Sequence, residues 1–175
     1  MKLESLVSIP YYTMQTLNWS EKKKNLIKLL KNYPEKKTGL QPFYTNNQSD
    51  KTGLTEAFSK IMTEELNMLV EKMQKPIQII NTWSVTYKQG DYHLPHNHGS
   101  IGFAGILYLQ FTKNSPETIY ILPFNDYETD KTIYRRIPVQ EGQIVIMPRF
   151  INHFTSPLEN NKIKRIISWD MFIKR

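Results

Sequence analysis

The hydrophobic pattern of the chain changes its period near the middle. Within residues 1–76, apolar residues recur at three- and four-residue steps in two stretches, which is the spacing of amphipathic helices. We expect one helix that begins near Ser20 and ends before Pro34, and a second helix of about five to six turns over residues 54–73. A polar connector at residues 38–52 separates the two helices.

Beyond residue 76 the period becomes two, and β-branched and aromatic residues become frequent, as in strands. Turn-forming residues divide this half into expected strands at residues 77–87, 102–111, 118–122, 131–139, 143–147 and 163–173. Several short strands at this spacing predict a barrel or jelly roll. We therefore expect a single domain over residues 1–175, of the α+β, mainly β class, with the helices of residues 1–76 packed on one face of a β core at residues 77–175.

Composition narrows the class of protein. Apolar residues make up 39% of the chain and aromatic residues 12%, which is too hydrophobic for a disordered protein. The absence of cysteine excludes thiol nucleophiles and disulfide scaffolds. The net charge of +7 is divided almost equally between the two halves, and the lysine cluster 22–24 fits the solvated face of a helix. This distribution does not favour nucleic acid as a partner.

The chain offers no sign of a membrane segment. Its longest uncharged apolar run, residues 101–111, is about half of a membrane span. The first seven residues lack the apolar core of a signal peptide. We expect no membrane partner and a cytoplasmic location, while the oligomeric state cannot be read from the sequence.

The four histidines are the most informative residues. His93, His96 and His98 lie within six residues of one another, and His153 follows on a distant strand. Alternate side chains of a strand share a face, so His96 and His98 are expected on the same side. Two imidazoles joined by a third from another strand leave open positions on a metal, as in non-haem iron sites. We predict a metal site formed by His96, His98 and His153, with His93 outside it.

Two spaced motifs surround these histidines. Gly90, followed after five residues by His96 and His98, is similar to the first cupin motif without its usual glutamate. Gly142, Pro148 and His153 are similar to the second cupin motif, with Phe150 where glycine is usual. Both motifs are typical of the double-stranded β-helix, a jelly-roll barrel with metal inside.

A closer resemblance covers most of the second half. It is carried by four segments in order: TWSVTYKQGDYHLPHNH at 82–98, GILYLQ at 105–110, EGQIVIMPRFINH at 141–153 and KRIISWD at 164–170. Together they resemble a bacterial and phage family of 2-oxoglutarate- and Fe(II)-dependent oxygenases that is distantly similar to prolyl 4-hydroxylases. The resemblance implies a cupin-like double-stranded β-helix that uses Fe(II) as cofactor and 2-oxoglutarate as cosubstrate.

The resemblance also implies roles for single residues. His96 matches the first metal ligand and His153 the distal one, while His98 stands where many relatives have Asp or Glu. Asp91 is the nearest alternative carboxylate. Tyr87 and Tyr108 match positions at which relatives place tyrosines near the cosubstrate.

The cosubstrate also needs a cation for its far carboxylate, and two residues of one strand compete for this role. Alternation along residues 163–173 allows either Arg165, with Trp169, or Lys164 to face the barrel interior. We choose Arg165, because its planar fork matches a carboxylate and because Trp169 is expected to be buried.

The function predicted first is a 2-oxoglutarate- and Fe(II)-dependent dioxygenase that hydroxylates a peptidyl or small-molecule substrate. One alternative is a three-histidine cupin-type dioxygenase that does not use 2-oxoglutarate. Another is a cupin-like domain that binds a small ligand without catalysis. The sequence does not identify the primary substrate.

Overall fold

The computed structural model describes residues 8–37, 42–47 and 52–174, and within them the chain forms three helices and eleven strands. The helices are α1 (Trp19–Leu30), α2 (Thr52–Ile61) and α3 (Thr63–Met73). The strands are β1 (Tyr12–Gln15), β2 (Lys36–Lys37), β3 (Tyr44–Thr45), β4 (Ile77–Tyr87), β5 (His93–His96), β6 (Phe103–Gln110), β7 (Thr118–Asn125), β8 (Thr132–Arg136), β9 (Gln143–Pro148), β10 (Asn152–Thr155) and β11 (Lys164–Ile173).

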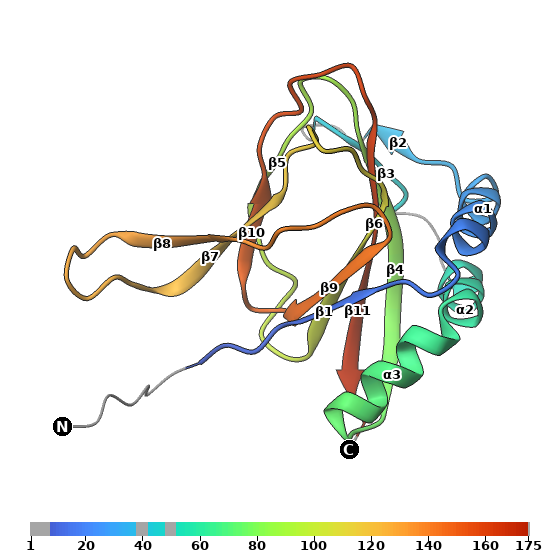
Figure 1. The fold of residues 1–175 in the computed structure, drawn as a ribbon, viewed down its shortest axis with the longest axis horizontal. Coiled ribbons are helices and arrows are strands. Elements are labelled where there is room, and N and C mark those ends of the chain that lie inside the picture. The colour runs from blue at the N-terminus through green and yellow to red at the C-terminus, as the bar shows by residue number, and fades with distance from the viewer. Residues whose placement is uncertain (1–7, 38–41, 48–51, 175) are drawn as a thin grey trace.

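The strands form two antiparallel sheets. The larger sheet has the order β1-β9-β6-β11-β4-β3-β2, and the smaller sheet has the order β5-β10-β7-β8. The sheets face each other, and the β7–β8 hairpin extends away from the body of the molecule (Figure 1). This is the mainly β, jelly-roll type of architecture that the strand spacing predicts.

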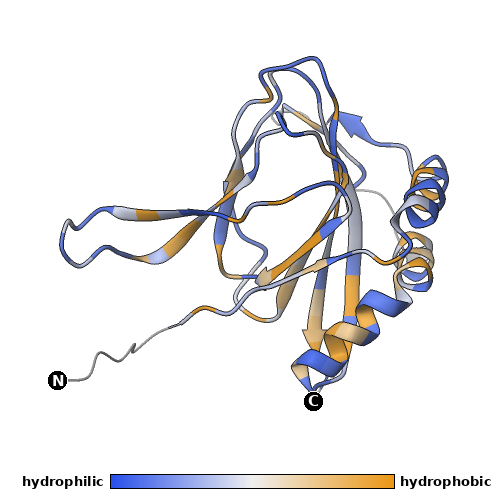
Figure 2. Cartoon of the chain, in the orientation of Figure 1, coloured by the Kyte–Doolittle hydropathy of each residue, from blue (hydrophilic) through white to orange (hydrophobic). Residues whose placement is uncertain are grey.

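The larger sheet is buried on both of its faces. Its inner face packs with side chains of the smaller sheet around Tyr87, Tyr108 and Met147. Its outer face is covered by the helices, through Leu26, Phe58 and other apolar residues (Figure 1). In Figure 2 the central strands are accordingly among the most hydrophobic segments of the chain. Helices on one face of the barrel are therefore confirmed.

The long expected strands are present, but the first 76 residues are not purely helical as predicted. β1 pairs with β9, where Tyr12 lies opposite Ile146, and β3 pairs with the end of β4. These strands are only two to four residues long, so their sequences carry too few alternations to indicate a strand. Residues 38–41 and 48–51 of the predicted connector lie outside the described residues.

The prediction of a single long helix over residues 54–73 is wrong, because the structure divides this segment into α2 and α3 at Met62. Met62 has φ −99° and ψ 19°, outside helical geometry. The buried stripe nevertheless continues across the break through Phe58, Met62 and Leu69. A hydrophobic period reports which face is buried, and it does not detect a local kink.

The interpretation of the lysine cluster on α1 as a solvated face is also corrected in part. Lys22 is buried rather than solvated, and its Nζ lies 2.6 Å from Glu64 Oε2 and 2.8 Å from Glu65 Oε2. The two carboxylates of α3 compensate the charge that burial removes from water.

No helix among the described residues is both long and apolar enough to cross a membrane.

Candidate metal centre

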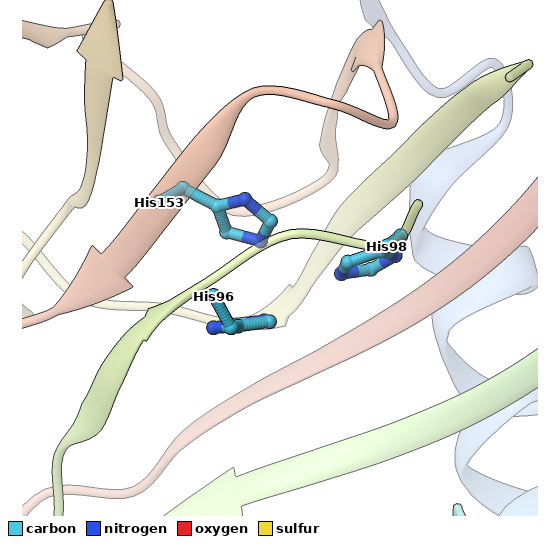
Figure 3. Close-up of side chains that lie close together, drawn as sticks. All are labelled: His96, His98 and His153. Atoms are coloured by element: carbon cyan, nitrogen blue, oxygen red, sulfur yellow. The ribbon is translucent and has the colours of Figure 1, made fainter. Parts of the chain in front are cut away.

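Three histidines converge inside the barrel. His96 ends β5, His98 follows two residues later, and His153 lies on β10 directly opposite His96 in the strand pairing. One ring nitrogen from each residue lies within 4.8 Å of the others. Figure 3 shows the three rings turned toward a common space between the strands. The structure thus brings together the three residues that the spacing of the histidines singled out.

The hydrogen bonds of these rings leave one nitrogen of each available. His96 Nδ1 lies 2.9 Å from Leu94 O, and His153 Nδ1 lies 3.0 Å from Ile151 O. His98 Nδ1 lies 2.8 Å from Asp170 Oδ1. Carbonyl and ionised carboxylate oxygens only accept hydrogen bonds, so Nδ1 carries the proton in each bond. In the neutral form of each ring, Nε2 then has a free lone pair. Neutral imidazoles with a fixed Nδ1–H are the form that ligates metals.

Burial favours this neutral form. Burial lowers the pKa of His96 and lowers the pKa of His153 well below its ordinary value, with the neighbouring imidazoles acting in the same direction. A proton on either ring would be poorly solvated and would repel the rings beside it. The donor set therefore fits a divalent transition metal that accepts nitrogen ligands, such as Fe(II), Mn(II), Ni(II) or Zn(II).

The other two candidates near the cluster take different roles. His93 stacks on His96 with ring centroids 3.9 Å apart, and its Nδ1 lies 3.2 Å from the Tyr87 hydroxyl. Burial, the largest effect, lowers its pKa to about 3. Asp91, the alternative carboxylate, instead accepts a hydrogen bond from the Lys88 backbone N–H at 2.8 Å. That bond closes a turn between β4 and β5.

The expectation that Arg165 faces the barrel interior is wrong. Lys164 is the inward residue and is fully buried, whereas Arg165 lies on the helix side and donates from Nε to Thr86 Oγ1 at 2.7 Å. Trp169 is buried as expected, but on the helix side against Phe58, with ring centroids 5.1 Å apart. Because both faces of this strand are buried, burial of Trp169 does not determine the register.

Lys164 is a buried cation held mainly by neutral groups. Its Nζ donates to Pro116 O at 2.8 Å and to Thr155 Oγ1 at 3.3 Å, and it lies 5.0 Å from the centroid of the Tyr87 ring. Among the described residues, no carboxylate lies within ion-pair distance of it. Burial lowers its pKa to about 7, since the charged form is poorly solvated there.

Both sequence-predicted tyrosines face the same interior. Tyr87 contacts His93 on one side and Lys164 on the other, so it lies between the histidine cluster and the buried cation. The Tyr108 hydroxyl donates to Thr118 Oγ1 at 3.0 Å. Burial raises the pKa of each phenol, so both remain neutral hydrogen-bonding groups.

Sequence reasoning missed several residues around the histidines. A cavity of about 300 Å³ reaches His93, His96 and His98 and is lined by Phe43, Trp83, Asp170 and the carboxamides of Asn47, Asn81 and Asn97, among others. Phe43 and Asn47 come from the segment expected to be a connector. No local motif signals such residues, because only the fold brings them to the cavity.

No protein-family model matches the chain, and no curated protein matches it by sequence. Similarity is found among solved structures. The epimerase SnoN of nogalamycin biosynthesis, a non-haem α-ketoglutarate-dependent enzyme, superposes with a TM-score of 0.72 at 8% identity, over 94% of this chain and 78% of that one.

Two further structures extend this similarity. HygX from Streptomyces hygroscopicus, with nickel, 2-oxoglutarate and hygromycin B bound, has a TM-score of 0.70 at 8% identity, covering 95% of this chain and 84% of that one. A Pseudomonas putida prolyl-4-hydroxylase has a TM-score of 0.63 at 10% identity, covering 95% of both chains. Over nearly its whole length, the chain therefore has the double-stranded β-helix fold of the 2-oxoglutarate- and Fe(II)-dependent oxygenases.

Proposed function

We propose that this protein is a 2-oxoglutarate- and Fe(II)-dependent dioxygenase that hydroxylates a peptidyl or small-molecule substrate. The observation that carries the proposal is the convergence of His96, His98 and His153, each with Nε2 free, inside a barrel of the oxygenase fold. In this proposal the three Nε2 atoms hold the metal and leave its remaining positions open.

Lys164 is the residue that we assign to the far carboxylate of 2-oxoglutarate. A fully buried ammonium without a carboxylate partner among the described residues is an unfavourable arrangement, and a bound anion would compensate its charge. Tyr87 lies between Lys164 and His93, which itself stacks on His96. The cosubstrate would therefore extend from the histidines along Tyr87 to Lys164.

The bound metal and cosubstrate would supply the oxygen chemistry, as cofactors do in such enzymes. The chain contributes orientation and protection from water. Phe43 and Trp83 pack beside His93 and His98, with ring centroids 4.2 Å and 5.3 Å apart, and form apolar walls. Asn47, Asn81 and Asn97 line the same cavity, so its wall is polar as well as aromatic.

A second function is favoured by the all-imidazole donor set. The group of residues that converges here contains no carboxylate, so no directly coordinating side chain would offset the charge of Fe(II). A cupin-type dioxygenase whose substrate itself chelates the metal would use such a site without 2-oxoglutarate.

One assay separates these functions. Protein loaded with Fe(II) is incubated with 2-oxoglutarate and oxygen, and succinate is measured together with oxygen consumption. We expect Fe(II)-dependent succinate formation, slow alone and faster with a suitable prime substrate, and none from His153→Ala. Metal binding without any succinate, across a panel of amino acids, peptides and small polar metabolites, would favour the second function instead.

A further inference from the structure

A chain of charged side chains lies behind one of the three histidines. His98 Nδ1 donates to Asp170 Oδ1 at 2.8 Å, and Arg149 Nη2 donates to Asp170 Oδ2 at 3.3 Å. Both oxygens of the carboxylate are therefore engaged. Asp170 is only 8% exposed and comes from β11, whereas Arg149 follows β9 and His98 follows β5. Three segments that are distant in sequence thus meet at this carboxylate.

We propose that Asp170 is a positioning residue for the metal centre, and that it supplies from behind His98 the negative charge that the donor set lacks. The inference rests on the proposed metal site. A carboxylate that accepts the Nδ1 proton fixes the tautomer and the ring plane of a histidine ligand and makes Nε2 a stronger donor. A charge one imidazole away from the metal still offsets part of the charge of Fe(II).

His98 differs in this respect from the other two histidines. His96 and His153 donate to the backbone carbonyls of Leu94 and Ile151, which carry no net charge. Only the bond of His98 is made to an ionisable side chain. His98 also stands at the position where the resemblance places a carboxylate ligand. A carboxylate is thus present at the site, but displaced from the ligand position to the residue behind it, where it also pairs with Arg149.

The carboxylate is itself held in place. Arg149 Nη1 donates to Ile101 O at 3.1 Å, and its guanidinium carbon lies 5.1 Å from the centroid of the Phe172 ring. Gly99 has φ +116°, a backbone conformation that favours glycine, so it permits the turn after His98. Trp83 packs on His98 from another side, with ring centroids 5.3 Å apart. The orientation of the His98 ring is therefore determined by several contacts at once.

The test is metal affinity, measured by calorimetry with Ni(II) and without cosubstrate. Asp170→Asn keeps the shape and an acceptor oxygen but removes the charge, and Asp170→Ala removes both. We expect affinity to fall by about 10- to 100-fold, with the larger loss in Asp170→Ala. Ser168→Ala, an inward and buried position on the same strand, is the matched control and should keep the wild-type affinity.

A double-mutant cycle separates positioning from a general effect on the fold. Nitrogen sites bind Ni(II) more tightly than Fe(II) or Mn(II), so the weakened Ni(II) affinity of His98→Ala is measured at high Ni(II) concentration. In that background Asp170→Asn should change Ni(II) affinity by less than about twofold, since the residue through which it acts is gone. The absorption spectrum of the Co(II)-loaded protein should differ between wild type and Asp170→Asn, while the circular dichroism of the metal-free proteins should not.

Unchanged Ni(II) affinity in both Asp170 variants would overturn this inference and leave the proposed function standing. An equal loss in the wild-type and His98→Ala backgrounds would also overturn it. Failure of the proposed metal site itself has a different signature, namely full Ni(II) affinity in His153→Ala.

Discussion

The two faces of β11 differ although both are buried. Toward the helices the strand presents Ile167, Trp169 and Met171 within an apolar cluster. Toward the barrel interior it presents Lys164, Ser168 and Asp170 beside Ile166, all less than 9% exposed. Polar and charged groups lose favourable hydration when they are buried, so the inner face gives up stability that the outer face provides.

This difference indicates what each face is for. The outer face joins the sheet to the helices, and its close packing is illustrated at Gly105, where a Cβ would lie 2.1 Å from the Trp169 ring. The inner face holds a cation and an anion that lead toward the histidine cluster. Buried polar and charged side chains that reduce stability are typical of sites that bind a ligand. The following predictions test this division, beginning with the largest effect.

The largest effect is expected at the histidine cluster. His153→Ala removes one of the three proposed ligands and should abolish detectable binding of Fe(II) or Mn(II), measured by calorimetry on metal-free protein. His93→Ala is the control, because His93 lies outside the converging group, and it should keep most of the metal affinity. Full metal affinity in His153→Ala would remove the basis of the proposed function.

The outer face should control stability alone. Trp169→Ala creates a cavity beneath Phe58 and should lower the free energy of unfolding by about 3–5 kcal/mol, measured by urea denaturation. Metal affinity of the protein that remains folded should stay unchanged. Ile80→Ala, at an exposed apolar position, is the control and should cost well under 1 kcal/mol. Loss of metal affinity in Trp169→Ala would mean that the two faces are coupled.

The inner face should control the affinity for the cosubstrate. Lys164→Ala should weaken 2-oxoglutarate binding to the Mn(II)-loaded protein by about 2–5 kcal/mol, at least tens-fold in affinity. Arg165→Ala, one residue away on the helix side, should change it by less than about threefold. If Arg165→Ala has the larger effect, the anchor is on the other face. If neither variant weakens binding, the 2-oxoglutarate proposal loses its main support.

A smaller effect is expected from pH. Burial lowers the pKa of Lys164 to about 7, and an anion binds its charged form. Above pH 7 the free protein must therefore take up a proton on binding, so 2-oxoglutarate affinity should fall by about tenfold per pH unit at most. The lowered pKa values of His96 and His153 keep these rings neutral over this range. Binding titrations of 2-oxoglutarate at several pH values from about 6.5 to about 8.5 measure how steeply the affinity changes with pH.

Lys164→Arg is the control for the pH effect. Arginine stays protonated throughout this range, so the affinity of that variant should be nearly independent of pH. A wild-type affinity that does not change with pH would mean that the ammonium does not titrate there. The same slope in wild type and Lys164→Arg would assign the titration to another group.

The sequence by itself determined the class of fold and the histidines of the candidate site. The change of period near residue 76 predicted helices followed by strands, because amphipathic elements mark their buried faces in the order of their residues. The close spacing of His96 and His98 indicated a shared side of the chain. His153 was recognisable because few histidines occur in the chain and because Pro148 and Gly142 precede it at motif spacing.

The tertiary structure alone decided which face of β11 is the inside, that Met62 interrupts a helix, and that Lys22 meets Glu64 and Glu65. Where helices cover one side of a strand and a barrel closes on the other, both sets of alternate residues are buried, and the period of two no longer distinguishes Lys164 from Arg165. The contact between His98 and Asp170 likewise joins residues 72 positions apart. Such pairings depend on how strands are aligned across the sheets, which local pattern does not encode.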